Sequence, residues 1–195
     1  HEVDYINRQQ GELCEACGAN LRQIALSDAL LDAWGSEAVL RETVARSGHV
    51  DLLDVNGAEP ISSVLSGIPG YVRVNYPDVD MQYLGFEDAS FDAVIHSDTL
   101  EHIPNPVQAL IECRRVLRPG GYLCYTVPIV VGRMTRGRAG LQPSYHGNPA
   151  MGQDDFVVHT EFGADAWTHL AHAGFRRIRL HTVGYPAAIA LSAIR

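Results

Sequence analysis

The pattern of apolar and polar positions changes about a quarter of the way along the chain. The first part places apolar residues at helical spacing, which predicts a helix over residues 21–34 that ends at Gly35 and a second short helix over 36–46. The rest alternates short β-rich runs with helical patterns, which favours a parallel sheet. The sequence therefore predicts a helical extension over residues 1–47 and an α/β domain over residues 48–195.

Four runs in the second part have the composition of buried strands and are bounded by turn residues. A helix is predicted before the last run, because Asn105 can cap it and Pro106 suits its first position. The turn residues 119–121 would then end this helix. The four predicted strands cover residues 50–55, 71–76, 91–96 and 122–127.

The last third of the chain predicts a long connection and a closing hairpin. Residues 129–158 are polar and glycine-rich, and a connection of that length is usually functional or disordered. A helix face follows over residues 162–173, with Gly174 after it, and then two strands over 175–182 and 187–194. Such a hairpin would add an antiparallel edge to the sheet. The predicted fold is a Rossmann-like, mostly parallel α/β sheet with a C-terminal antiparallel hairpin.

The amino-acid composition and net charge limit which kinds of binding partner we expect. The 195 residues are 46% hydrophobic and carry a net charge of −8, which argues against nucleic acid as the main partner. No apolar run reaches the roughly 20 residues that cross a bilayer, and no signal peptide is visible, so we expect no membrane partner and a cytoplasmic location. Arg133, Arg136 and Arg138 are the local exception, either as a solvated loop or as a contact for an anionic substrate.

Cys14 and Cys17 have the spacing of half a zinc knuckle. The other two cysteines fall inside a predicted helix and a predicted strand, too far away to complete a tetrahedral site. His1 or His49 could contribute, but nothing in the spacing requires it. We therefore predict no bound metal, and reduced thiols agree with the cytoplasm.

In an open parallel sheet, ligands collect beyond the carboxyl ends of the strands, so the loop after the first strand is the first candidate site. It reads Asp54-Val55-Asn56-Gly57-Ala58-Glu59-Pro60. A single glycine in such a turn is also typical of an ordinary strand-to-helix connection.

A longer motif lies downstream. Residues 80–103 run from Asp80 through Ser90-Phe91-Asp92 to Leu100-Glu101-His102, and residues 114–121 read Arg-Arg-Val-Leu-Arg-Pro-Gly-Gly. This arrangement resembles the class I S-adenosylmethionine-dependent methyltransferases, in their type 11 branch. The resemblance covers about residues 49–128, and segments near both ends are similar to a sub-branch.

The resemblance implies S-adenosylmethionine as cofactor and a contact for each of its parts. The methionine portion would face residues of the first loop, namely Asp54, Asn56, Gly57 and Ala58. The ribose would face Asn75, after the second strand, and the adenine would face Asp80 and Met81. The transferable methyl group would lie beside His96 and Ser97, after the next strand.

Three departures from the family pattern put this transfer in doubt. The family's Gly-x-Gly-x-Gly is Asn56-Gly57-Ala58-Glu59-Pro60 here, and side-chain bulk restricts the approach of a ligand. Asn75 replaces an acid and carries no charge. Only four residues separate Asn75 from Asp80, whereas a parallel crossover needs about a dozen. Either the third strand and its preceding helix are lost, or a segment is absent from this sequence.

Methyl transfer is an in-line displacement that often uses a general base. His146, in the long connection, is the first candidate, and His96, beside the predicted methyl group, is the second. The alternatives are a surface turn for His146 and a backbone-orienting role for His96. His102 is predicted to be structural and His159 to lie on the surface.

The sequence thus predicts methyl transfer from S-adenosylmethionine to a small molecule, such as a sugar or a secondary metabolite. The alternative is a catalytically inactive module that keeps the fold for binding or assembly. The broken glycine loop, the uncharged Asn75 and the missing crossover favour that alternative.

Overall fold

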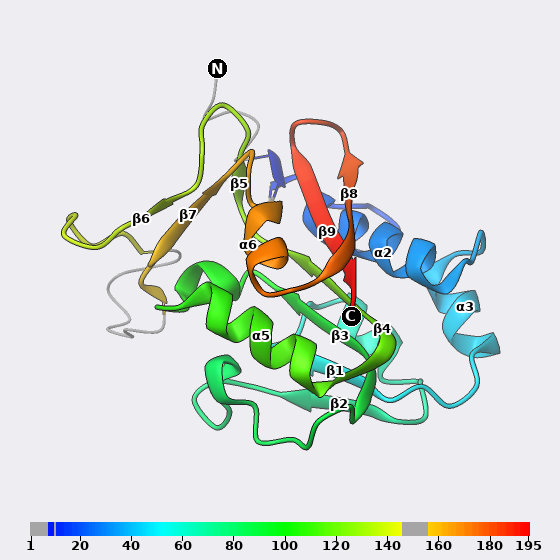
Figure 1. The fold of residues 1–195 in the computed structure, drawn as a ribbon. Helices are drawn as coiled ribbons and strands as arrows, with labels where there is room; N and C mark the ends of the chain where they lie inside the picture. Colours follow the sequence, from blue (N-terminus) through cyan, green and yellow to red (C-terminus); the bar gives the residue numbers. More distant parts are fainter. Residues whose placement is uncertain (1–7, 10, 146–155) are drawn as a thin grey trace.

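The computed structural model describes residues 8–9, 11–145 and 156–195 and centres on a six-stranded sheet with the order β2-β1-β3-β4-β9-β8 (Figure 1). The first four strands in this order are parallel, and β9 runs antiparallel to both of its neighbours. The fold class predicted from the sequence is confirmed. The strands are β1 (Leu52–Val55), β2 (Tyr71–Val74), β3 (Phe91–Ser97), β4 (Leu117–Thr126), β8 (Arg176–Val183) and β9 (Ala188–Ile194).

The sheet ends at β2, because no further strand pairs with it among the described residues. Between β2 and β3 the chain forms only a short turn of 3-10 helix, η1 (Met81–Tyr83). A tight turn leads into it, closed by the Val79 N–H, which donates to the Asn75 carbonyl at 3.0 Å. The described chain therefore has neither the family's third strand nor the helix before it, which both alternatives drawn from the sequence predict.

Helices cover both faces of the sheet (Figure 1). One apolar core lies under α2 (Leu21–Trp34), α3 (Leu40–Arg46) and α4 (Ile61–Leu65), and the other lies under α5 (Pro106–Val116) and α6 (Trp167–His172). Asn20 and Gln23 cap α2 reciprocally, and Gly35 ends it at φ 63°. Because α2 shares its core with the sheet, the division at residue 48 remains a prediction from the sequence alone.

Two predicted boundaries are wrong for a tertiary reason. The helix after Asn105 ends at Val116, not at the turn residues 119–121, because Leu117 already pairs with Phe91 at the start of β4. The predicted helix over 162–173 begins only at Trp167, since Phe162 belongs to a strand.

A small second sheet occupies part of the predicted long connection. Its order is β5-β7-β6, with β5 (Ile129–Val130), β6 (Arg136–Gly137) and β7 (Thr160–Gly163). It stands beside the carboxyl ends of the large sheet's parallel strands, next to a second 3-10 turn, η2 (Leu100–His102). None of the described helices is long and apolar enough to cross a membrane.

Candidate functional site

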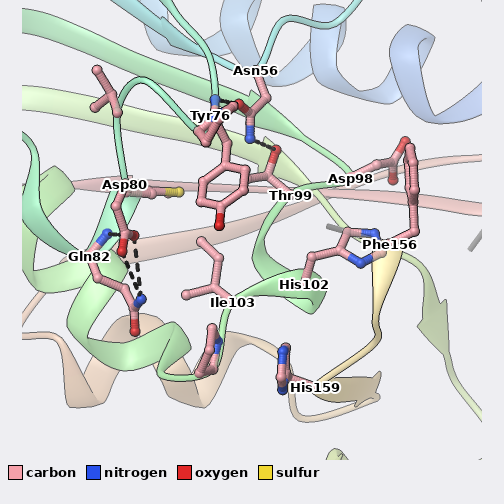
Figure 2. Close-up of a pocket in the computed structure, with 14 residues that line it drawn as sticks. Asn56, Tyr76, Asp80, Gln82, Asp98, Thr99, His102, Ile103, Phe156 and His159 are labelled. Carbon is pink, nitrogen blue, oxygen red and sulfur yellow. Dashed lines mark hydrogen bonds between the residues drawn. The ribbon is translucent and has the colours of Figure 1, made fainter. Parts of the chain in front are cut away.

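A cavity of about 750 Å³ opens at the carboxyl ends of β1, β2 and β3 (Figure 2). The chain runs from β1 outward to β2 and then returns to β3, so the cavity lies where the strand order reverses. Its volume is within the range of small-molecule sites. The described lining residues are Asn56, Tyr76, Pro77, Val79, Asp80, Met81, Gln82, Asp98, Thr99, His102, Ile103, Pro104, Phe156 and His159.

Asn56 ties together the ends of all three strands. It follows β1 and adopts φ 67°, a left-handed conformation that Asn tolerates better than most residues. Its side-chain oxygen accepts from the Tyr76 N–H at 2.8 Å, and its amide donates to the Thr99 hydroxyl at 3.4 Å. The family's first glycine is thus replaced by a residue that cross-links the cavity floor and still lines it.

The two sides of the cavity differ in chemistry (Figure 2). On one side, the Asp80 carboxylate accepts from the Gln82 backbone N–H at 2.8 Å and begins η1, beside Met81. On the other side stand His102 and Phe156, whose rings meet edge to face. Two carboxylates and no Lys or Arg occur among the described lining residues, an arrangement that favours a cationic ligand group over an anionic one.

Asp54 supports the first loop from below instead of facing the cavity. It is fully buried and accepts from the Ser62 hydroxyl at 2.5 Å and the Tyr71 hydroxyl at 2.7 Å. Ser62 in turn accepts from the Ala58 N–H at 2.6 Å, so the chain of contacts fixes the loop. Burial raises the pKa of Asp54, although these hydrogen bonds oppose the rise.

Gly57 and Asn75 lie around the guanidinium of Arg73 and do not line the cavity. Gly57 has φ +72°, and a side chain there would collide with the Arg73 guanidinium. Arg73 also binds Glu59 at 2.7 Å and donates to the Asn75 side-chain oxygen at 3.3 Å. An arginine thus covers the outer side of the loop, while Ala58 is buried in the core.

His96 and Ser97 end β3 beneath the cavity. Ser97 hydrogen-bonds the Thr126 hydroxyl at 2.8 Å. The His96 ring is fully buried and stacks on Tyr125 with centroids 4.6 Å apart, and its nitrogens have no hydrogen-bond partner among the described residues. Burial lowers the pKa of His96 to about 3. In this position the ring does not reach the cavity, so its predicted role as a base gains no support from the geometry.

The buried His96 ring makes stability depend on pH. Its folded pKa of about 3 lies below the unfolded value of 6.5, so acid favours the unfolded chain, which binds a proton that the folded chain excludes. Between pH 7.5 and 5.5 we expect His96 to cost about 1.4 kcal/mol of unfolding free energy. His96→Phe, which keeps an aromatic ring against Tyr125, should remove this loss. Urea unfolding at both pH values measures it, and equal losses for both proteins would contradict the burial.

Of the nine predicted cofactor contacts, the structure brings Asn56, Asp80 and Met81 to the cavity. His146, the first predicted base, lies outside the described residues. The sequence reasoning missed several lining residues. Asp98 and Thr99 could have been found, because they follow a parallel strand directly; Phe156 and His159 come from a distant segment that no local pattern connects to the site.

His102, predicted to be structural, is held in a defined orientation at the cavity wall. Its Nδ1 lies 3.0 Å from the Val157 carbonyl, which can only accept, so this nitrogen carries the proton. Its Nε2 then presents a lone pair and lies 3.7 Å from the buried Glu101 carboxylate.

Asp98, which also lines the cavity, is paired with a residue of the N-terminal helix α2. Arg22 is only 2% exposed, and its Nη2 lies 3.2 Å from an Asp98 carboxylate oxygen. Asp98 itself has φ 49°, a left-handed conformation. The N-terminal part of the chain therefore helps to place a wall residue of the cavity.

Cys14 and Cys17 lie away from this site, in a turn closed by the Gly18 N–H, which donates to the Cys14 carbonyl at 2.8 Å. Both thiols are free. Across the described ranges, no three metal-ligating side chains come together. The metal-free half-knuckle remains a prediction.

Residues 65–125 match the family model of a methyltransferase domain. Over 99 residues the chain is 33% identical to the ubiquinone biosynthesis O-methyltransferase of Hahella chejuensis, covering 50% of this chain and 42% of that protein. Over 88 residues it is 35% identical to the ubiquinone/menaquinone biosynthesis C-methyltransferase of Brucella anthropi, covering 43% and 33%. The chain thus spans less than half the length of these relatives.

Among solved structures, the CurJ carbon methyltransferase resembles the chain with a TM-score of 0.60 and 16% identity, covering 99% of this chain and 58% of that chain. At this identity the likeness shows the fold alone. Residues 65–125 are thus similar to a methyltransferase domain, and the sheet with its switch-point cavity has the Rossmann-like fold of such enzymes.

Proposed function

We propose that this chain transfers the methyl group of S-adenosylmethionine to a small molecule bound in the cavity. The cavity at the switch point carries the proposal, because its floor is formed by the family's cofactor loop and its described walls hold Asp80 and Asp98 but no cation. The cofactor would supply an electrophilic methyl group on a positively charged sulfur. The Asp80 carboxylate suits that group, because it pairs with no Lys or Arg among the described residues, whereas Asp98 is already paired with Arg22.

The cofactor's place follows from the residues that reach the cavity. Asp80, Met81 and Gln82 offer a carboxylate, an apolar side chain and an amide on one side, which suit the ribose hydroxyls and the adenine. Asn56 and Thr99 form the floor between the two sides. Asp54, Gly57 and Ala58 would act indirectly, by holding the loop in shape, and Asn75, His96 and Ser97 would do so at the strand ends.

The acceptor would occupy the opposite side, between His102, Phe156 and His159. Because Nδ1 of His102 is engaged by a carbonyl, Nε2 is the nitrogen that would take a proton from an acceptor hydroxyl or amine. We therefore propose His102 as the general base among the described residues, and His146 remains a candidate outside them. Phe156 offers a flat apolar surface to a ring. The named relatives act on oxygen and on carbon, which supports a small-molecule acceptor, such as the predicted sugar or secondary metabolite.

The kind of partner and the cellular location are part of the same proposal. The net charge of −8 argues against nucleic acid as the substrate. A cytoplasmic location would match the supply of the cofactor and the free thiols.

Binding of S-adenosylhomocysteine, the demethylated product, tests the proposal directly. At one hundred times its dissociation constant the ligand should raise the unfolding free energy by about 2.7 kcal/mol, which corresponds to roughly 5–10 °C in melting temperature. Asp80→Ala should reduce the shift, whereas Asp88→Ala, an exposed change outside the cavity, should leave it unchanged. No shift in the unmodified protein at millimolar ligand would refute the proposal.

One observation favours the alternative of an inactive binding module. The Arg73 guanidinium and its Glu59 partner cover the glycine loop, where the family has small residues. In that case Asn56→Gly with Ala58→Gly would not improve binding of S-adenosylhomocysteine. A gain of binding in this double variant would instead indicate a working cofactor pocket.

A further inference from the structure

Three arginines of the small sheet converge on one carboxylate. Nη2 of Arg133 and Nε of Arg136 lie 2.7 Å and 2.8 Å from the same oxygen of Glu161, and Arg138 binds the other oxygen. Glu161 and Arg138 are only 14% and 15% exposed, whereas Arg136 is 54% exposed. In this cluster Glu161 and Arg138 are mostly buried while Arg136 is exposed, so the arginines do not form the solvated loop that the sequence also allowed.

The register of the small sheet places this cluster beside the cavity. Arg136 pairs directly with Glu161, and the Arg138 N–H donates to the His159 carbonyl at 2.9 Å one step further along β7. Residues opposite each other in an antiparallel pair share a face, and so do residues two apart in a strand. Arg136, Arg138, Glu161 and His159 thus lie on one face, Arg133 joins it through its contact with Glu161, and His159 lines the cavity. Two strand residues span roughly 7 Å, the reach of a small molecule.

Among the described residues, the charge of the cluster does not balance. Three guanidinium groups face a single carboxylate, and the Nε groups of Arg133 and Arg138 have no acceptor among the described residues. The Asp165 carboxylate accepts from the Thr135 N–H at 2.6 Å. The excess of positive charge is concentrated at one edge of a chain whose net charge is −8.

Glu161 stays ionised within this cluster. Burial by itself would raise its pKa, but hydrogen bonds from Arg136 and Arg138 and the charge of Arg133 lower it overall. The carboxylate therefore fixes the three arginines at neutral pH and leaves the outer edges of Arg133 and Arg136 available. Paired guanidinium edges bind phosphate oxygens through two parallel N–H bonds.

We propose that Arg133 and Arg136, set in place by Glu161, bind a phosphate group on the methyl acceptor at the rim of the cavity. This inference rests on the proposed function and specifies the acceptor class, a small phosphorylated molecule. A phosphate monoester carries a charge of about −1.5 to −2 at neutral pH, close to the excess of the cluster, whereas a carboxylate carries one charge. The cavity, whose described lining has no Lys or Arg, would hold the cofactor and the reacting atom, and the arginines would hold the distal anion.

Titration with inorganic phosphate, against sodium chloride at equal ionic strength, tests the site through the melting temperature. We expect phosphate to stabilise the full chain more than chloride. The double variant Arg133→Gln, Arg136→Gln should bind phosphate at least tenfold more weakly, and Arg136→Gln alone, the milder change, severalfold more weakly. Arg179→Gln is the matched control, since Arg179 is 58% exposed and paired with Asp32 on another edge of the molecule; it should bind as the unmodified protein does.

Three results would overturn the inference: phosphate no better than chloride, phosphate binding within twofold of normal in both arginine variants, or acetate equal to phosphate. Binding of S-adenosylhomocysteine is measured on the same proteins and should be unchanged by the arginine variants. If the unmodified protein binds phosphate through these arginines but not S-adenosylhomocysteine, the anion site stands and the proposed methyl transfer fails.

Discussion

His102→Asn is expected to lower kcat by roughly two to three orders of magnitude, the typical contribution of a general base. Asparagine can still donate a hydrogen bond toward the Val157 carbonyl, which His102 Nδ1 contacts at 3.0 Å, but it offers no group that takes up a proton. The fold and the binding of S-adenosylhomocysteine should therefore remain, while turnover falls. The measurement is kcat and KM with the acceptor, together with the melting temperature.

The pH profile separates a base from a merely structural residue. If His102 accepts the proton, the pH dependence of kcat should differ in shape between the unmodified protein and His102→Asn, whereas the loss of a merely structural residue should leave the shape unchanged. His172→Asn serves as the control, because His172 is exposed on α6 and does not line the cavity. A His102→Asn variant with activity within threefold of normal would exclude the assignment.

Arg22→Met is expected to lower the unfolding free energy by about 3 kcal/mol, near the lower end of the cost of breaking a buried ion pair. Methionine preserves most of the apolar packing of the arginine stem but removes the guanidinium that lies 3.2 Å from Asp98. Because Asp98 is 33% exposed, water screens part of the loss. Urea unfolding measures the change, and the binding of S-adenosylhomocysteine should weaken in parallel, since Asp98 lines the cavity.

The matched control is Arg46→Met, which removes an exposed ion pair with Glu42 on α3 and should change stability by less than about 0.5 kcal/mol. The double variant Arg22→Met, Asp98→Asn should recover part of the loss, because the carboxylate no longer needs its partner. Equal effects of Arg22→Met and Arg46→Met would show that the α2 contact does not hold the cavity wall.

The order of elements could be predicted from the sequence because its signals are local. Alternating β-rich runs and a capped helix at Asn105 predict a parallel sheet, and the four residues between Asn75 and Asp80 are too few for a crossover. The last residue of the helix after Asn105 could not be predicted, because the pairing of Leu117 with Phe91 depends on a strand that is distant in sequence.

The candidate site could be predicted only in part, for a similar reason. Asn56, Asp80 and Met81 were found because they follow strands or stand in a family motif next to them. The burial of His96 was not found, since a residue at the end of β3 can point toward the ligand or into the core, and the side chains that pack around it decide which. The burial of Arg22 could not be predicted from local sequence, because a single arginine on a helix is expected to face solvent unless its ion-pair partner is known.

The sequence by itself therefore predicted the fold class, the resemblance to cofactor-dependent methyltransferases and the edge of the sheet where the cavity opens, because each follows from the order and spacing of neighbouring residues. Only the tertiary structure decided which side chains face the cavity and which charges meet. His102, His159, Arg22 and the three arginines on Glu161 owe their positions to contacts between segments 20 to 80 residues apart, and a charge or a ring acquires its role from what lies beside it in space.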